Sequence, residues 1–143
     1  MSDKKQIVIK DACILFDLID LGILAHFYQL DIKVYSTSIV ISEVVDENQL
    51  NEIRMYIESG KICIDSSSAL EDIIEIIDKN KGLSLADGSV LELATRIGGY
   101  VLSSDKSLRN EAARRNIKVR GVLWVIEELQ KNKIIDQPYA LEI

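Results

Sequence analysis

The sequence contains few of the residues on which small disulfide-bonded or zinc-binding proteins depend. Its 143 residues include two cysteines and one histidine. Cys13 and Cys63 lie in apolar stretches, where a buried free thiol is the usual state. His26 has no cysteine or second histidine near it, whereas zinc sites need several such ligands. We therefore expect no disulfide and no zinc site, a helix-surface or packing role for His26, and a reducing, cytoplasmic location.

Long apolar runs and proline-rich linkers are also missing. No run approaches the roughly 18 residues of a membrane span, and the first apolar run, at residues 7–9, is too short for a signal peptide. The one proline, Pro138, lies close to the last residue. We expect no membrane association and a single domain over residues 1–143, with a core at residues 6–132 and a tail at 133–143.

What the sequence does contain is an alternation of short apolar runs with longer amphipathic segments. This alternation is typical of an α/β protein with a parallel sheet and helices on both faces. The apolar runs predict about five strands, at residues 6–9, 33–36, 61–64, 100–103 and 117–120. The amphipathic segments predict helices at residues 12–18, 23–30, 39–44, 49–58, 69–79, 85–97, 108–116 and 122–131.

Several helix ends carry local signals. Ser68 and Ser84 each stand three residues before an acidic residue, which is the pattern of a capping box at a helix start. Gly60 and Gly82 follow amphipathic stretches and are interpreted as helix stops.

Four acidic residues, Asp11, Glu43, Asp87 and Asp105, lie where a predicted strand ends or a predicted helix begins. Ligands bind at the carboxyl ends of the strands in open α/β sheets. Carboxylates gathered there repel one another, and a divalent cation with oxygen ligands relieves the repulsion. Taken singly, each acid has an ordinary alternative role, as a helix cap for the three aspartates and as a solvated helix position for Glu43.

Asp87 is predicted to point inward. At helical spacing it shares a face with Val90, Leu91 and Ala94, which are expected in the core. The capping-box acid is its alternative role.

The charge distribution is uneven. The net charge of the chain is -6, but residues 105–120 carry a local balance of +4, which leaves -10 for the rest. A basic flank beside an acidic site can hold a phosphate backbone while a metal acts next to it. Ion pairs on a solvated helix face are the alternative explanation.

The order and spacing of the acidic motifs resemble the PIN-domain superfamily of metal-dependent ribonucleases, whose best-populated branch is the VapC-like toxins of bacterial toxin–antitoxin pairs. The matching motifs span residues 7–120 and consist of Asp11 with the apolar residues after it, Ser42-Glu43-Val44, Leu83-Ser84-Leu85-Ala86-Asp87, and Ser103-Ser104-Asp105-Lys106-Ser107-Leu108. Cys13 stands where many members of the family have serine or threonine.

This resemblance implies a three-layer α/β/α sandwich in which the four acids meet in one groove and hold Mg²⁺ or Mn²⁺, with Ser103 ordering the site. Lys106, Arg109, Arg114 and Arg115 would contact the RNA. The implied activity is that of a metal-dependent endoribonuclease that hydrolyses phosphodiester bonds. The VapC-like branch adds the expectation of a toxin of a type II pair, with an antitoxin as partner. Two alternatives stay open, namely a catalytically inactive PIN-like binding module and a Mg²⁺-binding receiver-like domain.

The last predicted helix suggests a homodimer. Val122, Leu123, Val125, Ile126 and Leu129 can face the sheet, whereas Trp124 falls off that stripe at helical spacing. A large aromatic residue off the core stripe is often an interface anchor. Packing of Trp124 beneath the tail, against Tyr139 and Leu141, is the alternative.

Overall fold

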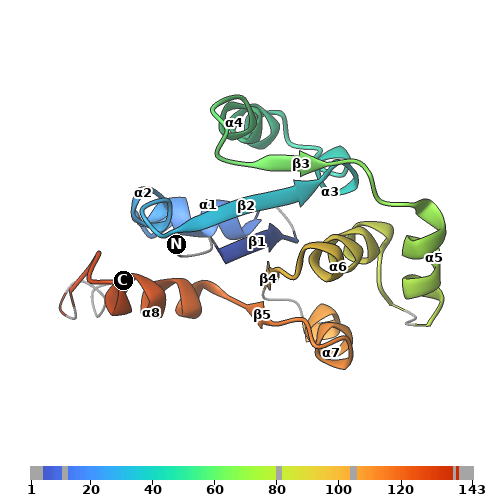
Figure 1. The fold of residues 1–143 in the computed structure, drawn as a ribbon. Coiled ribbons are helices and arrows are strands. Elements are labelled where there is room, and N and C mark those ends of the chain that lie inside the picture. Colours follow the sequence, from blue (N-terminus) through green and yellow to red (C-terminus); the bar gives the residue numbers. More distant parts are fainter. Residues whose placement is uncertain (1–4, 11–12, 80–81, 104–105, 137, 139–143) are drawn as a thin grey trace.

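The computed structural model describes residues 5–10, 13–79, 82–103, 106–136 and 138. Within these residues the chain forms a five-stranded sheet in the order β3-β2-β1-β4-β5, and every neighbouring pair is parallel (Figure 1). The strands are β1 (Lys5–Ile9), β2 (Ile32–Thr37), β3 (Cys63–Asp65), β4 (Tyr100–Leu102) and β5 (Val119–Arg120).

Helices connect the strands and cover both faces of the sheet, which confirms the expected three-layer α/β/α architecture. They are α1 (Cys13–Asp20), α2 (Leu24–Phe27), α3 (Ser38–Ser42), α4 (Glu47–Glu58), α5 (Leu70–Asp78), α6 (Leu85–Ile97), α7 (Lys106–Arg114) and α8 (Val122–Lys131). None of the helices in the described ranges is long and apolar enough to cross a membrane.

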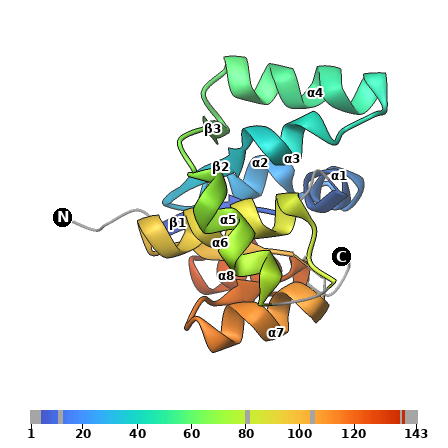
Figure 2. The ribbon, with the colours of Figure 1, turned by 90° about the vertical axis from the view of Figure 1, so that its right-hand side faces the viewer.

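The period-two alternation of the strands divides the core into two layers. Ile7 and Ile9 of β1 pack with α1, α2 and α8 on one face, whereas Val8 between them packs with α6 and α7 on the other. Figure 2 shows α4 and α7 at opposite ends of the molecule. α7 packs against the edge strand β5, and α4 directly precedes the other edge strand, β3, in the chain. Ile7, Val8 and Ile9 are therefore each buried by the helix layer toward which they point.

α6 is the most deeply embedded of these helices. Eight of its thirteen residues are buried, and α5 packs along its outer side (Figures 1 and 2). The close approach requires Gly88, because a Cβ atom there would lie 2.9 Å from side-chain methyls of both Ile73 and Ile77. The face of α6 that bears Gly88 is thus covered by α5.

Some expected details differ from the structure. Ser68 does not cap α5: the N-cap is Ala69, which makes no side-chain cap bond, and the Ser68 hydroxyl instead bonds to the Asp65 and Glu92 carboxylates. α2 ends at Phe27, because the Leu30 N–H turns back to the Phe27 carbonyl just before β2 begins.

The two cysteines were both expected to be buried. Cys63 is a free thiol that is only partly buried, because β3 lies at the edge of the sheet. The side chain of Cys13 lies outside the described part of the structure. His26 is half-buried in α2, consistent with a packing role.

The exposed apolar residue of α8 is Leu123 rather than Trp124. Leu123 is 69% exposed, whereas Trp124 is partly buried, with its ring 5.7 Å from the Tyr100 ring and 5.6 Å from the Lys5 ammonium. Helical spacing alone put Leu123 on the buried stripe and Trp124 off it. Contacts with β1 and β4 explain why Trp124 is covered.

Candidate functional site

The strand order places a switch point between β1 and β4. The chain moves from β1 toward β2 and β3 on one side and returns to β4 and β5 on the other. Ligand sites of open α/β sheets form outside the carboxyl ends of the strands at such a point. Lys10 follows β1 and donates its N–H to the Leu102 carbonyl of β4 at 3.3 Å, and Ser103 follows β4. Lys10, directly before Asp11 in the sequence, and Ser103, two residues before Asp105, therefore both lie at the switch point.

Asp87 stands in the first turn of α6 and is 6% exposed. Ser84 is the N-cap: its hydroxyl accepts the Asp87 N–H at 3.1 Å, while Asp87 Oδ2 accepts the Ser84 N–H at 3.0 Å. This reciprocal pair is the capping box that the sequence predicted. The box fixes the carboxylate in one orientation and uses one of its two oxygens.

The second oxygen of Asp87 is the unusual one. Oδ1 is buried and accepts no hydrogen bond. The nearest charge recorded for it is the Lys10 ammonium, with Nζ 3.8 Å from Oδ1, a separation longer than a hydrogen bond. A buried anionic oxygen without a donor costs free energy unless a cation compensates it. Asp87 is therefore oriented, desolvated and incompletely paired.

A chain of buried hydroxyl groups links α3 to the start of α6. Thr37 Oγ1 accepts the Val40 N–H at 3.1 Å and so caps α3. It also lies 2.8 Å from Ser89 Oγ. The Ser89 hydroxyl donates its only hydrogen to the Ala86 carbonyl at 2.7 Å, so Thr37 must be the donor to Ser89. The residue after Ala86 is Asp87, which ties its position to α3.

The other predicted acids differ in what the structure says of them. Glu43 is the C-cap of α3 and is exposed, and its carboxylate has no hydrogen-bond or ion-pair partner recorded in the described ranges. Asp11 and Asp105 lie outside the described residues. Among the described residues, no three His, Cys, Asp or Glu side chains are grouped closely enough to hold a metal ion. The structure thus brings Asp87 to the switch point and leaves the carboxylate of Glu43 in solvent.

Ser103 is buried, 3% exposed, and its N–H donates to the Arg120 carbonyl at 2.9 Å. It is fixed beside the switch point by the pairing of β4 with β5. Its supporting role at the site stays a prediction.

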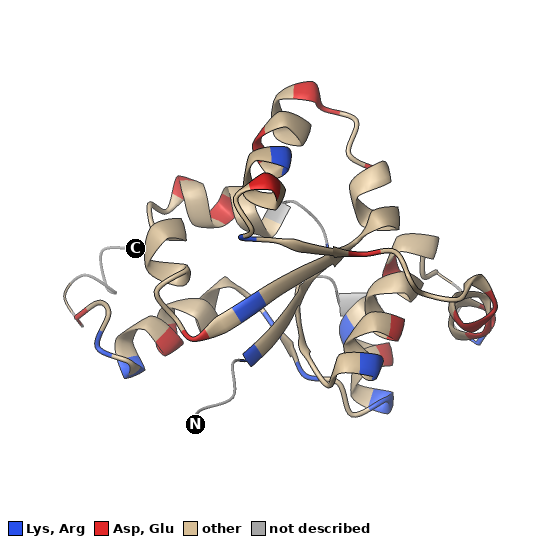
Figure 3. Cartoon of the chain, turned by 45° about the horizontal axis from the view of Figure 1, so that its top comes forward, with Lys and Arg blue, Asp and Glu red and all other residues tan. Residues whose placement is uncertain are grey.

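The predicted RNA-binding residues divide into two groups. Near the switch point lies Arg109: a Cβ at Gly121 would be 3.7 Å from its Nη2 atom and 4.0 Å from the Ser103 carbonyl. Arg114 and Arg115 instead contact buried Glu111, at 3.6 and 2.9 Å. The side chain of Lys106 lies outside the described part of the structure. Figure 3 shows basic residues gathered at the lower right, where α7 lies.

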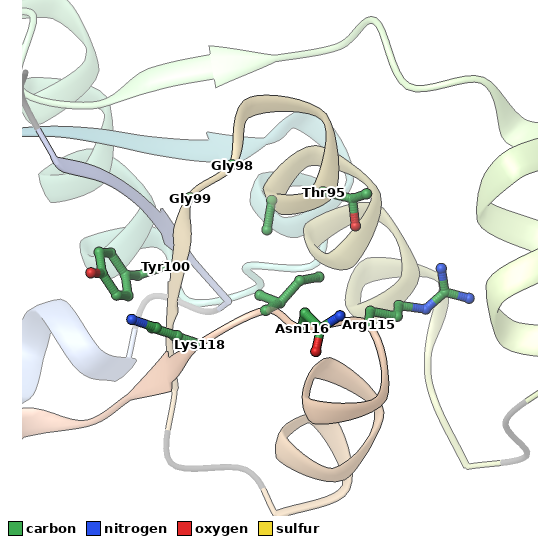
Figure 4. A pocket seen from close by; sticks show the side chains of 9 residues that line it. Thr95, Gly98, Gly99, Tyr100, Arg115, Asn116 and Lys118 are labelled. Carbon is green, nitrogen blue, oxygen red and sulfur yellow. The ribbon is translucent and has the colours of Figure 1, made fainter.

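Arg115 also borders a surface hollow at the opposite ends of β4 and β5. This hollow, about 310 Å³ in volume, lies between the ends of α6 and α7 and the starts of the two strands (Figure 4). Tyr100 and Lys118 line it, with the Lys118 ammonium 5.7 Å from the Tyr100 ring centre. Helix C-termini carry partial negative charge, and cations there complement it. The hollow is thus separate from the acidic switch point.

The sequence reasoning missed Lys10, Thr37 and Ser89 as parts of the site. Lys10 carried a signal, since it is a charge at the end of an apolar run directly before Asp11. Thr37 and Ser89 are 52 residues apart in the chain, and no local pattern connects them.

Two solved structures are similar to this chain. One is a PilT N-terminus domain protein, SSO1118, from the hyperthermophilic archaeon Sulfolobus solfataricus, with a TM-score of 0.61 and 13% identity over 87% of this chain and 92% of that one. The other is PAE2754 from Pyrobaculum aerophilum, with a TM-score of 0.62 and 14% identity over 90% of this chain and 96% of that one. At these identities the likeness shows the fold alone.

The search of curated proteins gave no match. The model of the PIN-domain family DUF3368 matches residues 7–141, nearly the whole chain. The chain therefore belongs to the PIN-domain superfamily, whose members are generally nucleases that use divalent metal ions.

Proposed function

We propose that this protein is a divalent-metal-dependent endoribonuclease in which Asp11, Glu43, Asp87 and Asp105 hold Mg²⁺ or Mn²⁺. The observation that carries the proposal is Asp87, a buried carboxylate at the switch point that has one oxygen held by the capping box and the other without a hydrogen bond. A hard oxygen atom in this state suits a divalent cation. Family membership supports the same chemistry.

The protein's own residues would prepare the site. The capping box orients Asp87 before any ligand binds, and the Thr37–Ser89 hydroxyl pair holds α3 and α6 together. Arg109, close to Ser103, would attract a phosphate group of the RNA. A bound divalent ion would supply an activated water for attack on phosphorus and would neutralise developing charge.

The direct test is cleavage of single-stranded RNA by the parent, Asp87→Asn and Asp78→Asn. Asparagine keeps an oxygen for the capping box but removes the charge, so we expect Asp87→Asn to fold and to lose at least about 100-fold in activity, since even residues behind the ligands contribute 10- to 100-fold. Asp78 is an exposed aspartate at the end of α5 and serves as the matched control.

Chelation should abolish cleavage by the parent, and Mg²⁺ or Mn²⁺ should restore it. Full activity of Asp87→Asn, or activity that persists in EDTA, would contradict the proposal. RNA binding by a parent that never cleaves would instead identify an inactive binding module.

A toxin role is the finer form of this proposal. If the protein is the toxin of a type II pair, its expression should arrest growth, and Asp87→Asn should relieve the arrest. Co-expression of the antitoxin, a small protein encoded next to the toxin gene, should relieve it as well. Normal growth during expression of an active nuclease would refute the toxin role and leave the enzymatic proposal intact.

We also propose a homodimer that buries the apolar surface around Leu123. This side chain is 69% exposed in the first turn of α8, next to Trp124, and contiguous exposed apolar surface marks protein–protein contacts. Leu123→Ala should weaken dimerisation by about tenfold, as expected for an interface residue worth more than about 1 kcal/mol. Met55→Ala is the control, because Met55 is 65% exposed on α4 at the far end of the molecule. A monomeric parent at micromolar concentration would rule the dimer out.

A further inference from the structure

Lys10 lies inside the acidic site. It is the first residue after β1, and its backbone is attached to β4 at the switch point. Its side chain is 21% exposed and its ammonium group is 3.8 Å from Asp87 Oδ1. Because that oxygen accepts no hydrogen bond, Lys10 supplies the positive charge recorded next to the most buried part of the carboxylate.

We propose that Lys10 is a resident cation of the metal site, which compensates Asp87 in the metal-free protein and is displaced when a divalent ion binds. This inference rests on the proposed function, because it concerns the same carboxylate and the same ion. The measured affinity for the divalent ion then depends on how much more strongly Asp87 binds that ion than it binds the Lys10 ammonium.

The geometry favours displacement over a permanent structural pair. The Lys10–Asp87 contact is a charge contact without a hydrogen bond, so Asp87 Oδ1 loses no directional bond when the contact opens. The ammonium is strongly hydrated and sits on a flexible four-carbon stem. Since the side chain is partly exposed, it reaches water by rotation of that stem while the backbone stays attached to β4.

The competition has a measurable consequence. Two unit charges about 4 Å apart interact strongly at the effective dielectric of a protein surface, although solvent and salt reduce this interaction. Removal of the Lys10 charge should therefore strengthen divalent binding by about tenfold. The metal-free protein should become less stable, since the Asp87 oxygen loses its counter-charge.

The experiment is a Mn²⁺ titration of the parent, Lys10→Met, Lys10→Arg and Lys79→Met. Calorimetry measures the Mn²⁺ affinity, and thermal unfolding measures the melting temperature with and without Mn²⁺. Lys10→Met should bind Mn²⁺ more tightly and show a lower melting temperature without metal and a larger rise with it. Lys10→Arg keeps the charge and should bind Mn²⁺ like the parent. Lys79 is the matched control, because its ammonium pairs with Glu75 at 3.2 Å on the exposed side of α5.

Equal Mn²⁺ affinity in the parent, Lys10→Met and Lys79→Met would overturn the inference while the proposed metal site stands. Weaker binding by Lys10→Met would also overturn it, since Lys10 would then help to form the site. An absence of Mn²⁺ binding in the parent and in every variant would refute both this inference and the proposed function. If Lys10→Met does not fold, Lys10→Gln takes its place, because it removes the charge and keeps a donor.

Discussion

α6 carries two acid–cation contacts that differ in how completely the charges are paired. At its start, Asp87 meets Lys10 through one contact of 3.8 Å. Toward its end, Arg96 binds the Asp65 carboxylate at 2.8 Å and the Glu92 carboxylate at 2.9 Å. The hydroxyls of two serines, Ser67 and Ser68, complete the second cluster.

The difference separates a structural network, in which the carboxylates are hydrogen-bonded, from a site in which one carboxylate oxygen is still able to bind a cation. In the Arg96 cluster, the hydrogen bonds from Arg96 are the first cause of the lowered pKa of both Asp65 and Glu92, and burial opposes the shift. In turn the two carboxylates raise the pKa of Arg96. Asp87 is more deeply buried than either acid yet has an oxygen without a donor. A folded chain tolerates such a deficit most readily where function requires it.

Metal binding should distinguish the two acid clusters most strongly. At a Mn²⁺ concentration of about 100 times Kd, the parent should gain about 2.7 kcal/mol in free energy of unfolding. Asp87→Asn should lose this gain, whereas Asp65→Asn should keep it, although its metal-free stability falls with the loss of the Arg96 contact. Thermal unfolding with and without Mn²⁺ measures both quantities. Equal metal responses in the two variants would remove the distinction drawn between the clusters.

Disruption of the Thr37–Ser89 hydroxyl pair, which holds the start of α6 against α3, should give the next largest change in stability. Thr37→Val removes a helix cap worth about 1 kcal/mol and a buried hydrogen bond worth about 1 kcal/mol, for a total loss of about 2 kcal/mol. Thr95→Val is the control, because the exposed Thr95 hydroxyl only donates to the Leu91 carbonyl within α6. It should change stability by less than about 0.5 kcal/mol. Urea denaturation measures both, and equal losses would contradict the role given to Thr37.

Local patterns in the sequence predicted the fold well. The α6 boundaries follow from a serine–aspartate capping box at one end and a left-handed Gly98 at the other, and both signals act over a few residues. The period-two strands and the helical stripes likewise depend on near neighbours.

Contacts between distant segments limited the prediction of the site. Ser68 had the pattern of a capping residue, yet its hydroxyl bonds to Glu92, 24 residues away. The Thr37–Ser89 and Lys10–Asp87 contacts exist only after the parallel strands place their carboxyl ends together. The inward orientation of Asp87 was foreseeable from its helical stripe, whereas the cation beside it was not.

The Arg96 cluster should give a smaller effect that depends on pH. Arg96→Gln should lower the free energy of unfolding by about 1 kcal/mol at pH 7, since the guanidinium is 39% exposed and partly screened. The folded pKa of Asp65 and Glu92 lies below the unfolded value, so their stabilisation is present above about pH 4 and is lost as the pH falls through the folded values. The parent and the variant should therefore converge in stability once the pH lies below the folded pKa values of Asp65 and Glu92. A difference that stays constant below those pKa values would show that Arg96 acts through packing rather than charge.

The smallest effect should come from the replacement of single cations at the proposed RNA-binding surface of α7. Arg109 lies beside Ser103 near the switch point, whereas Arg115 is held by Glu111 at 2.9 Å and borders the hollow at the other end of β4. We expect Arg109→Ala to weaken binding of single-stranded RNA about threefold and to reduce the salt-dependence slope by about 0.7, the value for one phosphate contact. Arg115→Ala should leave that slope unchanged and reduce stability instead, because it leaves buried Glu111 with a weaker partner, Arg114, at 3.6 Å. Fluorescence anisotropy at several salt concentrations, with each variant's unfolding measured in parallel, decides between them. If Arg115→Ala lowers the slope and Arg109→Ala does not, the RNA lies along the far end of α7, and the proposed path past the acidic site is wrong.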